Sequence, residues 1–213
     1  MKRMIALALM ALLRMTAIAA HAEDGSGTLV VYFDYSENMG DLSGMTVDAI
    51  TSASLNAKTE NTQGNLQVMA QAIQEATGAE VFPIHVEETH DPVYLNMVMG
   101  AGEDQENNRA FTVIGLPEDF DGYDTIYFGT PVWHAQLPQQ VASFLQQVDW
   151  SGKLVIVFGI HLGSGWGRNI QQIKELQPNT DIIEGMTVYA STANGEARQE
   201  MMNYLKNDDG GAA

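Results

Sequence analysis

Residues 153–176 read KLVIVFGIHLGSGWGRNIQQIKEL, and this stretch contains the three local signals that decide the fold class. The run Lys153–Phe158 is apolar and β-branched, which is typical of a strand buried on both faces. The segment Gly159–Arg168 is rich in glycine, and we expect a helix over 167–176. A buried strand, a glycine loop and a helix in this order indicate one β-α unit of a parallel sheet.

The same alternation continues on both sides of this unit. Further strands are predicted at 28–33, 80–85, 124–129 and, more weakly, 181–189. Further helices are predicted from Leu66 to about Gly78 and at 136–147 and 194–206, with another possible around 94–99. Pro83 has no backbone N–H, so we place the 80–85 strand at the edge of the sheet. The chain is therefore expected to be an α/β protein with a doubly wound parallel sheet and helices on both faces.

Length and composition limit the function classes. The 213 residues predict one domain, at 28–206, and 45% hydrophobic with 17% charged residues excludes a disordered chain. A formal charge of −17 argues against nucleic acid and anionic membranes as partners. The absence of cysteine excludes disulfides, thiolate metal sites and cysteine nucleophiles.

The N-terminal residues 1–22 are predicted to be a secretory signal peptide. Lys2 and Arg3 precede a short apolar run, and residues 20–22, AHA, form a small-x-small cleavage site. The alternative is an amphipathic N-terminal helix that remains on the protein. Cleavage after Ala22 removes three basic residues and takes the formal charge from −17 to −20. The expected product is an exported acidic protein without a stable membrane insertion.

Two segments are additional to what a minimal five-stranded α/β domain needs. Short segments flank the domain at both ends. Residues 38–61 form an insertion between the first strand and its helix, and residues 91–121 separate the second and third strands. Residues 23–27 are expected to be a linker and 207–213 a disordered tail. Long loops of this kind in a compact domain are usually functional or mobile.

Ligands of open parallel sheets bind beyond the carboxyl ends of the strands, so the loops that leave those ends are the candidate site. A helix start near Gly64, with the hydroxyls of Ser36 and Thr62, suits a phosphate dianion. Trp133 offers a flat apolar face for a planar ring, although packing in the core is the alternative. His161 lies in the glycine loop, where it is either a ligand donor or a solvent-facing side chain.

Three stretches of the chain resemble the flavodoxin family. They are GTPVWHAQLP at 129–138, the segment at 149–176 and IIEGMTV at 182–188, and the resemblance extends over about 28–205. It implies a five-stranded sheet of order 2-1-3-4-5 and an FMN cofactor bound without a covalent bond. The phosphate of FMN would lie in the first βα loop and its ring between the loops after the third and fourth strands. The positions that match the family's cofactor-binding motifs are Ser36, Asn38, Thr62, Gly64, Asn65, Thr130, Pro131, Val132, Trp133, His134, His161, Gly163, Ser164, Gly165 and Trp166.

The phosphate loop departs from the family pattern at one position. Asp34 stands where the family usually has Ser or Thr. A carboxylate there repels a phosphate dianion unless it turns away or carries a proton. No catalytic triad and no metal site is predicted, because the acidic and histidine residues at 85–91 alternate faces of an extended chain.

Three functions remain open at this stage. The leading hypothesis is an exported FMN-binding electron carrier whose partner is a basic redox protein or a small electron acceptor. The second is an FMN-dependent reductase that passes hydride from NAD(P)H to a quinone-like acceptor. The third, motivated by Asp34, is a non-catalytic binding module that keeps the fold but has lost FMN.

Overall fold

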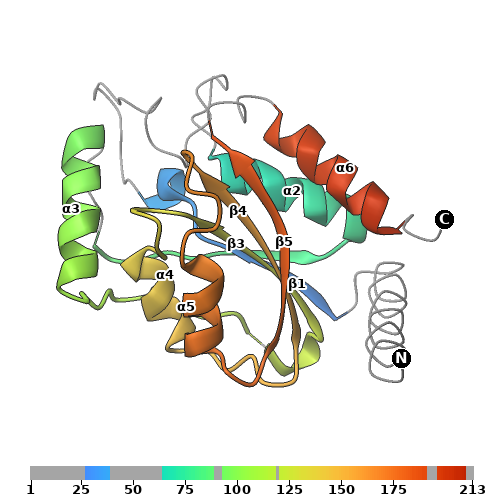
Figure 1. Ribbon diagram of the computed structural model, residues 1–213. Helices are drawn as coiled ribbons and strands as arrows, with labels where there is room; N and C mark the ends of the chain where they lie inside the picture. Colours follow the sequence, from blue (N-terminus) through green and yellow to red (C-terminus); the bar gives the residue numbers. More distant parts are fainter. Residues whose placement is uncertain (1–26, 39–63, 89–92, 119, 191–195, 210–213) are drawn as a thin grey trace, which may run out of the picture.

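The structure is a computed structural model that describes residues 27–38, 64–88, 93–118, 120–190 and 196–209. Its five strands form one parallel sheet of order β2-β1-β3-β4-β5 (Figure 1). The strands are β1 Thr28–Tyr32, β2 Glu80–Pro83, β3 Thr125–Pro131, β4 Leu154–His161 and β5 Asp181–Tyr189. This confirms the predicted fold class, the strand order and the edge position of β2.

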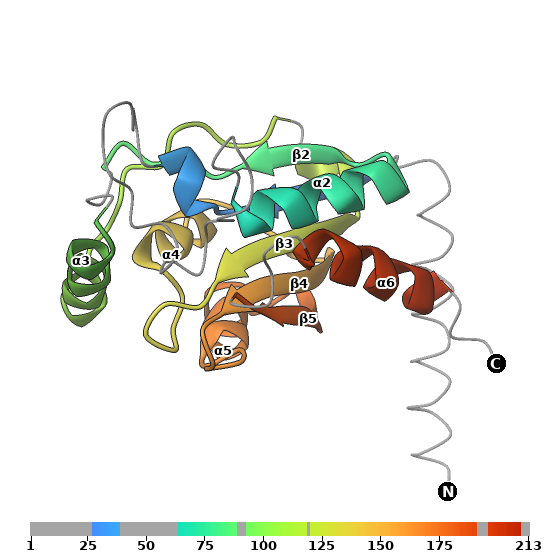
Figure 2. The same cartoon turned by 90° about the horizontal axis from the view of Figure 1, so that it is seen from above.

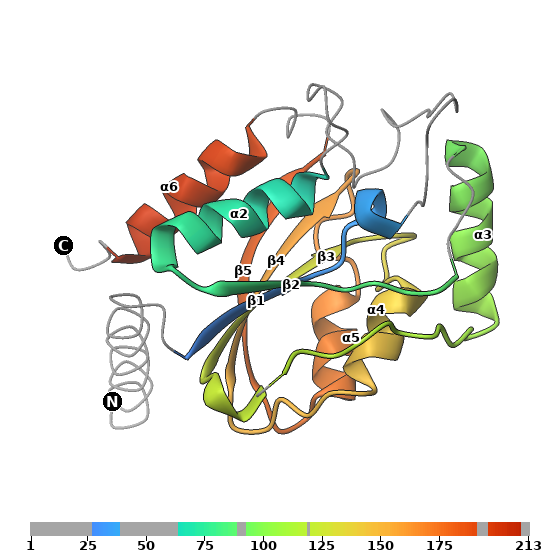
Figure 3. The same cartoon turned by 180° about the vertical axis from the view of Figure 1, so that it is seen from behind.

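Helices cover both faces of the sheet, as Figures 2 and 3 show. One face carries α2 Asn65–Thr77 and α6 Ala197–Asp209, and the other carries α4 Gln139–Leu145 and α5 Asn169–Leu176. The helix α3 Tyr94–Glu106 stands at the end of the molecule beside α4 (Figure 1). Two short 3-10 turns, η1 Tyr35–Asn38 and η3 Phe120–Gly122, follow β1 and precede β3.

The central strands supply both halves of the core because successive side chains point to opposite faces. In β3, Ile126 and Phe128 pack in the layer under α4 and α5, whereas Tyr127 packs under α2 and α6. The largest fully buried side chain, Trp150, meets Phe128 with ring centroids 4.9 Å apart. The apolar runs that predicted the strands are thus the sheet's two buried surfaces.

The two edges of the sheet differ in length. At one edge β2 has four residues and ends at Pro83. At the other edge β5 has nine residues, and its pairing with β4 shifts register at Gly185. Exposed acidic side chains at Asp181 and Glu184 lie on this second edge strand. A Cβ on Gly185 would lie 2.5 Å from the carbonyl oxygen of Val157, so the irregularity brings the two backbones unusually close.

Several predicted boundaries are wrong by a few residues. β3 and β4 extend through Pro131 and His161, because their backbones remain paired up to the link between Pro131 and Ile160. The helix predicted around 94–99 continues to Glu106, and α6 extends to Asp209, into the segment predicted as a disordered tail. The predicted signal peptide and most of the 38–61 insertion lie outside the described residues. Within the described part of the chain, no helix is long and apolar enough to cross a bilayer.

The buried side-chain amide of Gln177 links the end of α4 to the turn that precedes β4. Its Oε1 accepts a hydrogen bond from the Trp150 N–H at 3.0 Å, and its Nε2 donates to the carbonyls of Leu145 and Val148 at 2.6 and 2.9 Å. We expect Gln177→Ala to lower the free energy of unfolding by about 2 kcal/mol, because three buried backbone groups lose their partner. Urea unfolding followed by circular dichroism measures this loss. Gln171→Ala, at an exposed position of the helix α5 that ends just before Gln177, is the control, with an expected change below about 0.5 kcal/mol.

Candidate functional site

The carboxyl edge of the sheet has a switch point between β1 and β3. β1 connects through α2 to β2 on one side, and β3 connects through α4 to β4 on the other. The connections that follow these two adjacent strands therefore leave toward opposite faces of the sheet. Ligands of open α/β sheets bind at such a point. The loops that leave β1, β3 and β4 all begin there.

Just after β1, a side-chain carboxylate caps the N-terminus of α2. Asp34 is fully buried, and its Oδ2 accepts hydrogen bonds from the N–H groups of Leu66 and Gln67, both at 3.1 Å. Its Oδ1 accepts from the Ser36 N–H at 2.9 Å and the Ser36 hydroxyl at 2.7 Å. Gly64, the residue before the helix, allows this approach, because a Cβ there would lie 1.8 Å from both carboxylate oxygens. Asp34 therefore takes the role of an N-terminal cap from thirty residues away in sequence.

The protonation of Asp34 is set mainly by its burial. Burial raises the pKa of the Asp34 carboxyl to about 6, since the charged form loses its solvation. The hydrogen bonds from Ser36 and Gln67 act in the opposite direction, and the charge of Glu37 adds to the rise. Burial and Glu37 also raise the pKa of the Tyr32 hydroxyl far above its usual value, so this hydroxyl stays neutral. At neutral pH the start of α2 therefore binds an ionised carboxylate.

Asn38 has a structural role in this arrangement. Its Nδ2 donates to the carbonyls of Asp34 and Ile84 at 2.9 and 3.0 Å, and its Oδ1 accepts from the Val86 N–H at 3.0 Å. The bonds with Ile84 and Val86 join the exits of β1 and β2, and the bond with Asp34 lies within the exit of β1. The predicted site residues Gly64 and Asn65 are also buried here, and Thr62 lies outside the described residues.

The indole of Trp133 is buried, which corrects the expectation of an open flat face. The side chain is 6% exposed, and its ring meets the rings of Phe33 and Tyr35 edge-on, with centroids 5.8 Å apart in each pair. Two aromatic side chains from the exit of β1 thus occupy the space beside this indole. The packing interpretation holds for Trp133 in this structure.

The other predicted residues after β3 are mainly structural. Thr130, Pro131 and Val132 are buried, and the Asn169 Nδ2 donates to the carbonyl of Pro131 at 3.0 Å. His134 is exposed, and its Nε2 lies 2.8 Å from the carbonyl oxygen of Val98, so it ties this loop to α3. These residues hold the loop in place rather than present it to a ligand.

The glycine loop after β4 is the open part of the edge. Gly163 and Ser164 are exposed, and Gly165 and Trp166 are partly buried. The Gly163 N–H donates to the Nδ1 of His161 at 2.9 Å, and partial burial lowers the pKa of this imidazole, which favours its neutral form. The ring of Trp166 lies against the backbone of β4, where a Cβ on Gly159 would approach it to 2.9 Å. The loop thus combines accessible backbone with one partly open indole.

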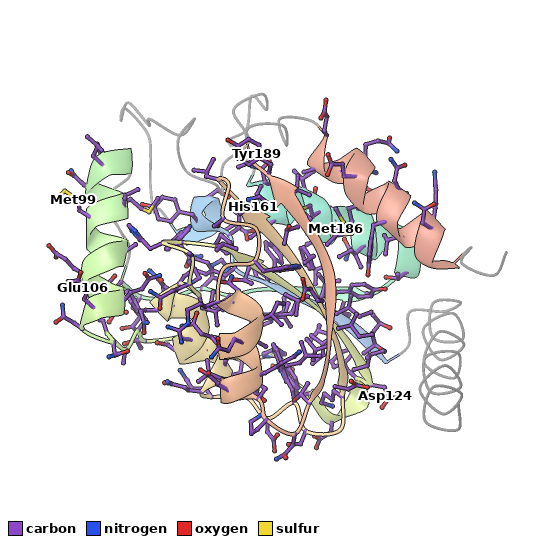
Figure 4. The ribbon with its side chains drawn as sticks, in the orientation of Figure 1. Met99, Glu106, Asp124, His161, Met186 and Tyr189 are labelled. Atoms are coloured by element: carbon purple, nitrogen blue, oxygen red, sulfur yellow. The ribbon has the colours of Figure 1, made fainter. Side chains whose placement is uncertain are left out.

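Tyr189 is a candidate that the sequence interpretation missed. It is the last residue of β5, pairs in register with His161, and is 43% exposed. Figure 4 shows the two side chains next to each other at the end of their strands, with ring centroids 5.8 Å apart. Its position as a large aromatic at the carboxyl end of a predicted strand is the signal that identifies it.

The site residues therefore fall into two groups at one edge. One group surrounds Asp34 at the start of α2, and the other comprises His161, the 163–166 loop and Tyr189. The loop after β4 is also fixed to the loop after β3, since the Arg168 N–H donates to the carbonyl of Ala135 at 2.8 Å. A separate pocket of about 220 Å³, lined by Gln139, Ser143, Gln172 and Glu175 among others, lies between α4 and α5. Its size is below that of typical ligand sites. No group of three or more His, Asp or Glu side chains in the described segments is placed to hold a metal ion.

Comparisons with known proteins agree with this architecture. The family model described as Flavodoxin matches residues 54–207, well over half of the chain. A candidate flavoprotein from Bacteroides uniformis is similar in structure, with a TM-score of 0.60 and 17% sequence identity over 86% of this chain and 99% of that one. A flavoprotein from Lactobacillus acidophilus, solved in complex with FMN, has a TM-score of 0.51 and 16% identity over 80% and 97% of the two chains. The likeness to these structures shows the fold, and the family match shows that this chain belongs to the flavodoxin family.

Proposed function

We propose that this chain binds FMN without a covalent bond and carries electrons in an exported compartment. The observation that carries the proposal is the pairing, at the switch point of a flavodoxin-family sheet, of an oxyanion-binding helix start with an open glycine and aromatic loop. The solved relative with FMN supports the choice of flavin.

The donor chemistry at the start of α2 fits a phosphate. The N–H groups of Leu66 and Gln67 and the N–H and hydroxyl of Ser36 converge on one pair of oxygens. Converging N–H donors at a helix start bind phosphate without the help of Lys or Arg. In this structure they bind the carboxylate of Asp34 instead, so the donors suit the phosphate of FMN but already have an acceptor within the chain.

The ring end of the site relies on the loop after β4. His161, Trp166 and Tyr189 are at least partly exposed rings at the ends of β4 and β5 and in the loop between β4 and α5, and Gly163 and Ser164 in this loop are exposed. When bound, the isoalloxazine of FMN supplies the redox chemistry by taking up and releasing electrons. The chain's part is to orient that ring, to donate hydrogen bonds to its edge and to limit water at one face.

The acidic charge of the chain supports the electron-carrier proposal. A formal charge of −17 disfavours an anionic reduced flavin, which lowers its reduction potential. The same charge attracts basic redox partners and steers their encounter. Small electron acceptors are the alternative partner class.

A flavin titration tests the proposal directly. We expect the purified protein to bind FMN with micromolar or tighter affinity, seen as quenched flavin fluorescence and as visible absorption retained after gel filtration. Tyr189→Ala is expected to weaken binding about tenfold, because a stacking contact of an aromatic side chain with a heterocycle contributes roughly 1–3 kcal/mol. Leu116→Ala is the matched control, since Leu116 is 42% exposed on the loop between α3 and η3, which contributes no residue to the proposed site. A protein that stays colourless with excess FMN contradicts the proposal and favours the non-catalytic binding module.

Export is proposed from the pattern of residues 1–22 and is tested separately. Mass spectrometry of the protein recovered outside the cytoplasm is expected to find a first residue of Glu23. Retention of residues 1–22 on the recovered protein would overturn this part of the proposal.

A further inference from the structure

The start of α2 shows a feature that flavin binding alone does not explain. The helix is preceded by Gly64, which has no side chain with which to cap it, and Asp34 on a different element caps it instead. Leu66 and Gln67 occupy the second and third helical positions, whose N–H groups have no partner within the helix. Their acceptor in this fold is therefore chosen by the residue at position 34.

The carboxylate and a phosphate make the same demands on these donors. Each backbone N–H has one hydrogen, and each of the N–H groups of Ser36, Leu66 and Gln67 already donates to Asp34 at 2.9 to 3.1 Å. A second anion beside a buried carboxylate also suffers charge repulsion that little solvent screens. A phosphate that reaches these donors must therefore displace the carboxylate of Asp34.

The surrounding charges do not relieve this competition. Glu37 is an ionisable acid whose charge raises the pKa of Asp34, and its Oε1 accepts a hydrogen bond from the Nε2 of Gln67 at 3.1 Å. Burial raises the pKa of the Glu37 carboxyl as well. Tyr32 contributes a neutral hydroxyl. None of the three elements around Asp34, namely β1, β3 and the first turn of α2, contributes a Lys, Arg or His.

We propose that Asp34 and the phosphate of the flavin are alternative occupants of the same four donors, so that Asp34 lowers the affinity for FMN relative to riboflavin, which lacks the phosphate. The inference rests on the proposed function for the flavin ring, but the competition itself concerns any phosphate. Asp34 is thus a specificity-determining residue that selects between two forms of one cofactor. Protonation near pH 6 removes its charge and weakens the competition.

The test compares FMN and riboflavin on the same variants. At pH 8, Asp34→Ser is expected to bind FMN at least about tenfold more tightly than the wild type, whereas riboflavin affinity changes less than about twofold. Asp34→Asn keeps the size of the side chain, removes its charge, and is expected to give an intermediate FMN affinity. As the pH is lowered from 8 to 5, the FMN affinity of the wild type is expected to rise relative to that of Asp34→Ser.

Glu37→Gln is the matched control because it removes one negative charge from the same corner without freeing the four donors. We expect it to change FMN affinity less than about threefold. An unchanged ratio of FMN to riboflavin affinity in both Asp34 variants overturns the inference. So does a gain in Glu37→Gln equal to that in Asp34→Ser, since charge alone would then explain the effect.

Inorganic phosphate separates this inference from the proposed function. In Asp34→Ser, nuclear magnetic resonance titration with phosphate is expected to give saturable shifts of the Leu66 and Gln67 amides, and the wild type at pH 8 is expected to give none. Phosphate binding without flavin binding supports the role of Asp34 and overturns the proposed function. Absence of phosphate and FMN binding in both Asp34 variants, with native circular dichroism, overturns the inference.

Discussion

Replacing Gly64 with alanine is expected to lower the free energy of unfolding by about 3 kcal/mol. The new Cβ would lie 1.8 Å from both carboxylate oxygens of Asp34, far closer than atoms that are not bonded can approach, so the carboxylate must leave its position. The N–H groups of Leu66 and Gln67 then lose their acceptor in a buried environment. The backbone conformation of Gly64, with φ −76°, is open to alanine, so the expected cost is steric and not conformational. Urea unfolding followed by circular dichroism measures it.

Two comparisons make the Gly64 prediction specific. Gly122→Ala is the control, because a Cβ there meets no atom within 4 Å, and its expected cost is below about 0.5 kcal/mol. In an Asp34→Ser background, Gly64→Ala is expected to cost less than half of its wild-type value, since the shorter side chain no longer occupies that space. Equal costs in both backgrounds would show that the clash with Asp34 is not the cause.

The stability that Asp34 contributes is expected to fall as the pH rises from about 4 to about 6. Burial raises the pKa of Asp34 to about 6 in the folded protein, whereas the unfolded chain has an ordinary carboxyl pKa of about 4. Between these values the folded state binds more protons than the unfolded state, so the free energy of unfolding decreases with pH. The shift corresponds to a loss on the order of 3 kcal/mol that is complete above about pH 7.

The measurement is the difference in unfolding free energy between wild type and Asp34→Asn across this pH range. Taking the difference cancels the titration of the other carboxyl groups. Glu88 gives a control of opposite sign, because hydrogen bonds from Thr112 lower the pKa of its carboxyl and make its contribution disappear as the pH falls. A wild-type minus Asp34→Asn difference that does not change with pH would contradict the assignment of a raised pKa to Asp34.

Much of the fold could be predicted because the signals for it are local. The apolar runs of β1, β3 and β4 are buried on both faces, and the pattern at 181–189 gives the bounds of β5. The strand ends were placed too early because Gly159 and Pro131 are typical of loops. In the sheet, pairing with the neighbouring strand keeps them extended. The acidic C-terminal half of α3 was not predicted as helix, since few of its side chains are buried, Ala101 and Asp104 among them.

The candidate site could be predicted from the sequence less fully than the fold, because its contacts join residues that are far apart in the chain. The departure of Asp34 from the family pattern predicts repulsion between its carboxylate and a phosphate. Nothing local in the sequence shows that Leu66 and Gln67 bind this carboxylate from 32 and 33 residues away. The burial of Trp133 likewise depends on Phe33 and Tyr35 from another loop. The sequence places Tyr189 at the end of a predicted strand, but its position beside His161 follows only from the register of β4 and β5.

The edges of the sheet bear on how this protein behaves at high concentration. Unpaired strand edges are templates for the addition of strands from other molecules, which leads to aggregation. Here β2 is short and ends in a proline that cannot donate, and β5 combines an irregular register at Gly185 with the exposed charges of Asp181 and Glu184. Both edges therefore disfavour such growth, and together with mutual repulsion between acidic molecules they favour a protein that stays dispersed in solution.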